Sequence, residues 1–182
     1  MNAKAPRAAT GIAGLDDILD GGFARHRLFL VEGMPGSGKT TLAFQFLMEG
    51  ARRGEPVLYL TLSETEEEIR AVADSHGWSL EGITIRQLIP AAEALEPDEQ
   101  YTMFHPSEVE LGETTKKILA DVAQFKPSRV VFDSLSELRL LSGGALRYRR
   151  QILALKQFLA GKQCTVLMLD DLTGAGHDLQ VL

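Results

Sequence analysis

The stretch that decides the fold is residues 27–41, which read RLFLVEGMPGSGKTT. Within it, GMPGSGKT at residues 33–40 matches the pattern G-x-x-x-x-G-K-[ST] at every fixed position. The apolar residues before this pattern predict a strand over 27–32, and apolar positions at helical spacing after it predict a helix over about 39–53. A glycine-rich turn between a buried strand and a helix predicts a phosphate-binding loop.

The residue types of the loop suit a nucleoside triphosphate, whose dense negative charge must meet several donors at once. Glycines let backbone N–H groups point inward, and the following helix adds its free N–H groups and the positive end of its dipole. Lys39 should reach the β- and γ-phosphates and act in catalysis, the Thr40 hydroxyl should bind Mg²⁺, and Thr41 should contact the α-phosphate. We therefore predict ATP and Mg²⁺ as cofactors. The residues predicted to hold the nucleotide are Pro35, Gly36, Ser37, Gly38, Lys39, Thr40 and Thr41.

The rest of the chain alternates strands and helices with short connections, which predicts an α/β fold with a mostly parallel sheet and helices on both faces. Further strands are expected over residues 57–62, 83–89, 129–132 and 165–169. Further helices are expected over about residues 64–75, 107–125 and 145–160, with an acidic loop over 90–106. We divide the chain into a flexible arm at residues 1–9 and one domain at residues 10–182.

Composition is that of a single-domain globular protein: of 182 residues, 45% are hydrophobic and 24% are charged. No apolar run could span a bilayer, and the N-terminus lacks the apolar core of a secretory signal. The single cysteine, Cys164, allows no intrachain disulfide, which fits a reducing compartment. A formal charge of −6 gives no general attraction to nucleic acid. We therefore expect a cytoplasmic protein that binds neither membranes nor, in general, nucleic acid.

Two acidic residues at strand ends are candidates for the chemistry. Asp133 ends the apolar run VVFD, where a second acidic group would hold magnesium through water; it could also be an ordinary strand-end aspartate. Glu64 follows the neighbouring strand and could orient or deprotonate the attacking water. It could equally be an acid favoured by the N-terminal dipole of the next helix. With the phosphate-binding loop present, we favour Asp133 as a magnesium ligand and leave both interpretations of Glu64 open.

An ordered set of motifs resembles the KaiC-like branch of the RecA superfamily of P-loop ATPases. The set begins with TGIAGLD at residues 10–16 and the phosphate-binding loop, and it continues with LYLTLSE at 58–64, SHGW at 75–78 and VVFDSLSELR at 130–139. Many folds share the loop alone, whereas the whole ordered set is far more specific. The resemblance covers residues 10–171, nearly the whole chain.

This resemblance implies a RecA-type core, ATP hydrolysis and assembly as a ring, usually a hexamer, with ATP between subunits. Lys39, Thr40, Thr41 and Asp133 match the nucleotide and magnesium positions of the family. Ser75 matches a position that contacts the nucleotide in the clock proteins of this family.

The chain departs from the family pattern in two places. The clock proteins have two adjacent glutamates after the second strand, where this chain has Ser63 and Glu64. Glu64 is then either the base itself, or hydrolysis is slow. The family domain also continues with further strands that would follow Leu182, so we expect a truncated domain that lacks its C-terminal strands.

Three functions remain open at this point. The first is a KaiC-like ATPase acting as a signalling or timing switch with a protein partner. The second is a DNA-dependent, recombinase-like ATPase, suggested by the RecA relationship and by the basic cluster at 147–150, although the net charge counts against it. The third is a nucleotide-gated interaction module that does not hydrolyse ATP, suggested by Ser63 and by the expected truncation. An autokinase activity cannot be read from the chain, which offers only Thr173 beyond its last predicted strand.

Overall fold

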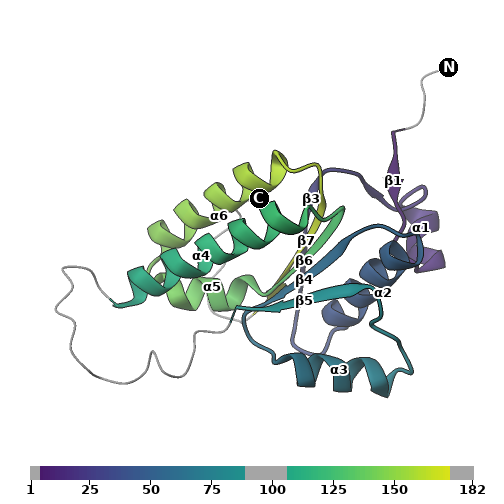
Figure 1. Cartoon of the computed structure of the whole chain (residues 1–182), viewed down its shortest axis with the longest axis horizontal. Helices are drawn as coiled ribbons and strands as arrows, with labels where there is room; N and C mark the ends of the chain where they lie inside the picture. The colour runs from purple at the N-terminus through teal and green to yellow at the C-terminus, as the bar shows by residue number, and fades with distance from the viewer. Residues whose placement is uncertain (1–4, 89–105, 173–182) are drawn as a thin grey trace.

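Five parallel strands form the central sheet of the computed structural model, which describes residues 5–88 and 106–172 (Figure 1). The strands are β3 (Leu28–Gly33), β4 (Val57–Thr61), β5 (Ile83–Gln87), β6 (Arg129–Asp133) and β7 (Thr165–Asp171). Their spatial order is β3-β7-β6-β4-β5, and every neighbouring pair is parallel. In this register Gly33 lies opposite Asp171, and Thr61 lies opposite Asp133. The carboxyl ends of all five strands therefore lie along the same edge of the sheet.

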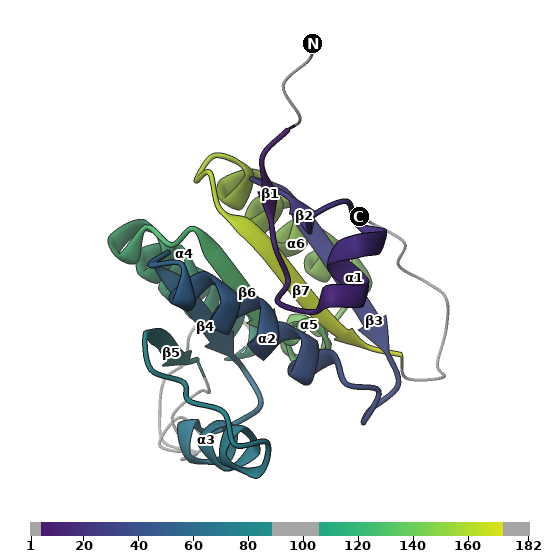
Figure 2. The same ribbon diagram turned by 90° about the vertical axis from the view of Figure 1, so that its right-hand side faces the viewer.

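Helices cover both faces of this sheet, as Figures 1 and 2 show from two sides. The helices are α1 (Ala13–Ile18), α2 (Lys39–Arg52), α3 (Glu66–Ser75), α4 (Pro106–Phe125), α5 (Leu135–Ser142) and α6 (Ala145–Ala160). The last three pack on one face, and α2 and α3 pack on the other. Strand β6 is buried throughout: Val130 and Phe132 enter one core, and Val131 enters the other. The middle of a strand covered on both faces is usually apolar at consecutive positions, which explains the run VVF between Arg129 and Asp133.

The expected α/β fold is confirmed, and several boundaries are close to those expected. The helix expected from residue 64 begins at Glu66, because Thr65 is its N-cap and forms a capping box with Glu68. Helix α5 was not expected, since its segment is short and directly follows a strand. The loop expected over 90–106 lies mainly outside the described residues. Among the helices that the structure describes, none is both long and apolar enough to cross a membrane.

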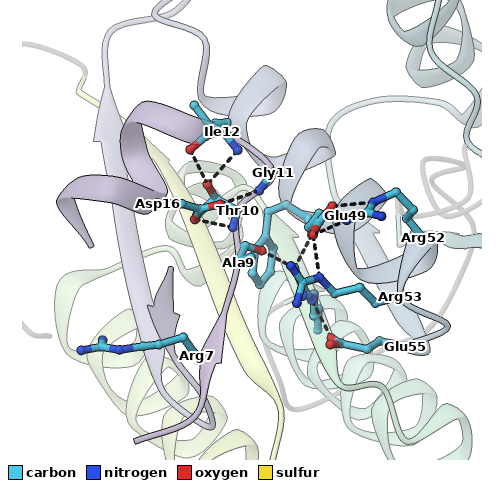
Figure 3. Close-up of polar contacts among 12 residues, drawn as sticks. Arg7, Ala9, Thr10, Gly11, Ile12, Asp16, Glu49, Arg52, Arg53 and Glu55 are labelled. Carbon is cyan, nitrogen blue, oxygen red and sulfur yellow. Dashed lines mark hydrogen bonds and ion pairs between the residues drawn. The ribbon is translucent and has the colours of Figure 1, made fainter. Parts of the chain in front are cut away.

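The arm expected over residues 1–9 is too long. Residues Arg7–Ala8 form strand β1, which pairs with β2 (Phe23–Ala24) in a small antiparallel sheet, and Ala8 is fully buried. A turn held by Asp16 follows: its two carboxylate oxygens accept hydrogen bonds from the amides of Thr10 (2.7 Å) and Gly11 (3.2 Å), as Figure 3 shows. The motif TGIAGLD therefore builds a structured entry to the domain, because its aspartate satisfies amides that a flexible arm would leave to water.

Arg129, the first residue of β6, links the N-terminal segment around Ala9 to the core. It is fully buried, and its guanidinium donates to the carbonyls of Ala9 (2.6 Å) and Phe46 (2.8 Å). It also forms an ion pair with Glu55 at 2.7 Å, and Glu55 binds Arg25 on its other side. A buried guanidinium needs such partners, because its charge would otherwise be costly to remove from water. Arg129 thus joins β6, α2 and the N-terminal segment.

Candidate functional site

The phosphate-binding loop is a tight, exposed turn between β3 and α2. Gly36 and Gly38 have φ values of +79° and +89°, a region that side chains disfavour, and Gly38 is the N-cap of α2. The chain folds so closely on itself that a Cβ on Gly33 would lie 2.4 Å from the Ser37 hydroxyl. The sequence folds this way because glycine stands where a Cβ would clash or strain the backbone. The turn thereby presents its backbone N–H groups at the start of α2, where an anion is favoured.

Lys39, the first residue of α2, reaches back over this loop. Its ammonium group donates to the carbonyls of Gly33 (3.0 Å) and Met34 (3.1 Å) and forms an ion pair with Asp171 at 2.7 Å. Asp171 can reach it because β3 and β7 are neighbours with Gly33 opposite Asp171. In the sequence, Asp170 and Asp171 follow the last predicted strand and could equally be ordinary turn residues. The strand order is what brings Asp171 to Lys39.

Asp171 is held in place by the helix that was not expected. The Ser136 hydroxyl of α5 accepts a hydrogen bond from the Asp171 amide (3.1 Å) and donates to the carboxylate of Asp170 (2.7 Å). Arg139, one turn further along α5, pairs with the same Asp170 carboxylate. The end of β7 is therefore fastened to α5, and this fastening fixes where the Asp171 carboxylate stands beside Lys39.

Replacing Asp171 by Asn should raise the affinity for ATP by about three- to fivefold. The carboxylate competes with a phosphate for Lys39, and a partly exposed ion pair of this kind contributes on the order of 1 kcal/mol. Titration of a fluorescent ATP analogue would measure the change, with the exposed Asp74→Asn on α3 as the control. Weaker binding by Asp171→Asn would contradict this competition and would make the carboxylate a contributor to nucleotide binding.

Thr40 and Asp133 meet at the next position along the sheet edge. The Thr40 hydroxyl donates to Asp133 Oδ2 at 3.4 Å, and the Tyr59 hydroxyl donates to the same oxygen at 2.5 Å. Asp133 is almost completely buried, and burial raises its pKa above the usual range, helped by the charges of Glu137 and Asp171. Burial and the charge of Asp133 also raise the pKa of Tyr59, so its phenol stays protonated and acts as a donor.

These oxygens fit a magnesium ion that is also bound by phosphate. Mg²⁺ prefers oxygen ligands and usually keeps several waters, binding through one or two protein groups together with substrate phosphates. The Thr40 hydroxyl and the Asp133 carboxylate are such a pair, at the mouth of the phosphate-binding loop. Among the described residues no group of three or more His, Cys, Asp or Glu side chains could bind a metal ion. A magnesium ion held by Thr40 and Asp133 would take its other ligands from phosphate and water.

Glu64 lies in the turn between β4 and α3, close to the same carboxylate. The Thr61 hydroxyl holds this turn by accepting hydrogen bonds from the amides of Ser63 (3.3 Å) and Glu64 (3.0 Å). Glu64 Oε2 is buried and has no hydrogen-bond partner among the described residues. Burial raises the pKa of Glu64, and the charge of Asp133 adds to this effect. Ser63, by contrast, is exposed. A half-buried carboxylate with one buried, unpartnered oxygen is suited to accept a proton.

The structure gives Ser75 a local role. It is the last residue of α3, it is exposed, and its hydroxyl donates to the carbonyl of Val72 at 2.7 Å. The nucleotide contact expected from the family resemblance stays a prediction.

A parallel sheet of this order, with a phosphate-binding loop after β3 and a buried aspartate at the end of β6, defines a KaiC-like ATPase of the RecA superfamily. The chain belongs to the KaiC family of ATPases, since the family model described as "ATPase: KaiC" matches residues 8–179.

Individual relatives agree with this assignment. A UPF0273 protein of Aeropyrum pernix is 31% identical over 175 residues, covering 92% of this chain and 68% of the relative. The circadian clock protein KaiC2 of Synechocystis is 35% identical over 175 residues, covering 94% of this chain and 29% of the relative. A crystal structure of a KaiC-like protein from Pyrococcus horikoshii superposes with a TM-score of 0.74 at 26% identity, covering 94% of this chain and 74% of that one.

Proposed function

We propose that this chain binds ATP with Mg²⁺ at the phosphate-binding loop and hydrolyses it to ADP and phosphate. The observation that carries the proposal is the convergence of three elements at one sheet edge. Lys39 and Thr40 come from the start of α2, Asp133 from the end of β6, and Glu64, with its unpartnered oxygen, from the turn after β4. These are the groups that phosphoryl transfer to water needs: a cation for the phosphates, metal ligands and a proton acceptor.

Each side chain has a separate role in binding or hydrolysis, set by its place in the fold. The Lys39 ammonium exchanges Asp171 for the β- and γ-phosphate oxygens, and the N–H groups of the loop bind the remaining phosphate charge. The Thr40 hydroxyl and the Asp133 carboxylate hold magnesium, whose charge stabilises the transferring phosphoryl group when it is bound. Glu64 orients a water molecule and takes its proton as the new oxygen–phosphorus bond forms and the bond to ADP breaks.

We further propose that the ATPase acts as a nucleotide-dependent switch in an oligomeric ring in the cytoplasm. Support comes from the similarity to KaiC2 of Synechocystis, which is named as a circadian clock protein. A ring would place ATP between neighbouring subunits and let hydrolysis change a subunit interface. Sedimentation of the chain with and without Mg·ATP tests the assembly step, and a mass that is the same in both conditions would count against nucleotide-controlled assembly.

Replacing Lys39 by Ala tests the nucleotide site itself. The affinity for Mg·ATP should fall by roughly 10- to 100-fold, because a charge-assisted hydrogen bond contributes about 1.5–3 kcal/mol. Isothermal titration calorimetry measures the loss, and Lys156→Ala, an exposed lysine on α6, is the matched control. An unchanged affinity in Lys39→Ala would remove the site assignment.

The alternatives predict different outcomes in the same preparation. A recombinase-like protein would show ATP hydrolysis stimulated by single-stranded DNA at low salt, and its DNA binding would weaken steeply as salt is added. A nucleotide-gated interaction module would bind Mg·ATP without turning it over. Steady-state hydrolysis that needs no DNA, and that is lost in Asp133→Ala, would favour the proposed ATPase over both.

A further inference from the structure

Tyr59, in the middle of β4, contacts Asp133 of the proposed magnesium site from inside the protein. Its side chain is fully buried, and its ring stacks on that of Phe44, with centroids 5.0 Å apart and planes 13° from parallel. Phe44 belongs to α2, the helix that begins with Lys39 and Thr40. The ring of Tyr59 therefore packs against the helix that carries the phosphate-binding lysine, while its hydroxyl points to the strand that carries Asp133.

The two carboxylate oxygens of Asp133 differ in their hydrogen bonds, because the hydroxyls of Tyr59 and Thr40 both donate to Oδ2. Oδ2 accepts from the Tyr59 hydroxyl at 2.5 Å and from the Thr40 hydroxyl at 3.4 Å. A hydroxyl proton that points at Asp133 leaves the lone pairs of Thr40 Oγ1 for a metal ion. A carboxylate turns readily about its terminal torsion unless partners hold it. The short bond from Tyr59 is the contact that can hold the plane of this carboxylate.

We infer that Tyr59 is a positioning residue for the proposed magnesium site. Its hydroxyl holds Oδ2 of Asp133 beside Thr40, which leaves the other carboxylate oxygen for a water bound to the metal. This inference rests on the proposed function, because it assigns Tyr59 a task only if Thr40 and Asp133 hold magnesium. Partners of this kind, behind the groups that bind a metal, orient those groups and change metal affinity by about 10–100-fold.

The expected result concerns the dependence on magnesium rather than overall stability. In Tyr59→Phe, which keeps the stacked ring and removes only the hydroxyl, ATP affinity in the presence of EDTA should stay unchanged. The Mg²⁺ concentration that half-saturates the gain in ATP affinity should rise about tenfold. Titration of a fluorescent ATP analogue at increasing Mg²⁺ measures both quantities. Thr115→Val, which removes another buried hydroxyl from α4, should leave both unchanged.

Asp133→Asn separates failure of this inference from failure of the proposed function. Suppose that Mg²⁺ no longer raises the ATP affinity of Asp133→Asn but raises that of Tyr59→Phe as much as in the unaltered protein. The role of Tyr59 is then wrong, and the magnesium site stands. If both variants keep the full gain in ATP affinity with Mg²⁺, the magnesium site itself is wrong. If Tyr59→Phe binds ATP more weakly by the same factor with Mg²⁺ and with EDTA, its hydroxyl serves packing alone, which overturns the inference. Thermal melting without nucleotide should show that both variants are folded.

Discussion

Glu64→Gln should slow ATP hydrolysis by roughly 10²–10⁴-fold, the usual contribution of a general base, and leave Mg·ATP affinity nearly unchanged. The carboxylate has a buried oxygen without a hydrogen-bond partner among the described residues, and it stands beside Asp133. Glutamine keeps the shape of the side chain but cannot take a proton from water. Single-turnover hydrolysis of radiolabelled ATP measures the chemical step separately from binding.

The raised pKa of Glu64 adds two expectations with definite signs. Hydrolysis by the unaltered protein should fall as pH drops through a pKa above the ordinary value of 4.5, because the base becomes protonated. The folded state also holds this proton more tightly than the unfolded state, so the carboxylate costs stability as pH rises from about 4.5 through the raised pKa. Glu64→Gln removes that cost and should raise the melting temperature at neutral pH.

Glu67→Gln is the matched control for this variant, since Glu67 is an exposed acid in the first turn of α3. It should change neither turnover nor the pH profile. Unchanged turnover in Glu64→Gln would remove the base assignment while leaving the nucleotide site in place. Undetectable hydrolysis by the unaltered protein, with ATP binding intact, would instead favour the nucleotide-gated interaction module.

Arg129→Met should lower the free energy of unfolding by about 3–5 kcal/mol, the cost of breaking a buried ion pair by removing one partner. Three protein oxygens lose a donor: the carbonyls of Ala9 and Phe46, and the carboxylate of Glu55. The guanidinium also lies over the Phe46 ring at 4.7 Å. Helix α2 packs so closely here that a Cβ on Gly50 would lie 2.6 Å from Arg129 Cδ.

Urea denaturation measures this loss, and Arg70→Met is the control. Arg70 is exposed and pairs with Glu66 on the surface of α3, so its removal should cost less than about 1 kcal/mol. ATP affinity of the folded Arg129→Met protein should be preserved, because Arg129 starts β6 while the site lies at its other end. A destabilisation below 1 kcal/mol would show that the surrounding oxygens find other partners.

Local patterns were sufficient wherever the chemistry is contained in one short segment. The loop at residues 33–40 could be recognised from its glycines, because the positive φ values of Gly36 and Gly38 and the close contact at Gly33 all fall within one short segment. Helix α2 and strand β6 could be recognised from the spacing of their apolar residues. A helix buried on one face has apolar residues every three or four positions, whereas a strand buried on both faces has a continuous apolar run. The sequence by itself therefore determined the α/β class, the place of the glycine-rich loop and its lysine between strand and helix, and the ordered motifs of the KaiC family.

Only the tertiary structure decided which distant side chains meet around that loop. Asp171 reaches Lys39 because β7 inserts beside β3, and Tyr59 reaches Asp133 because β4 and β6 pair. In the sequence, nothing distinguishes Tyr59 from the other residues of a predicted strand, or Arg129 from the other charged residues. Strand order depends on the packing of every helix against both faces, and no local pattern encodes it. Contacts between residues far apart in the chain are therefore the part that only the folded sheet could reveal.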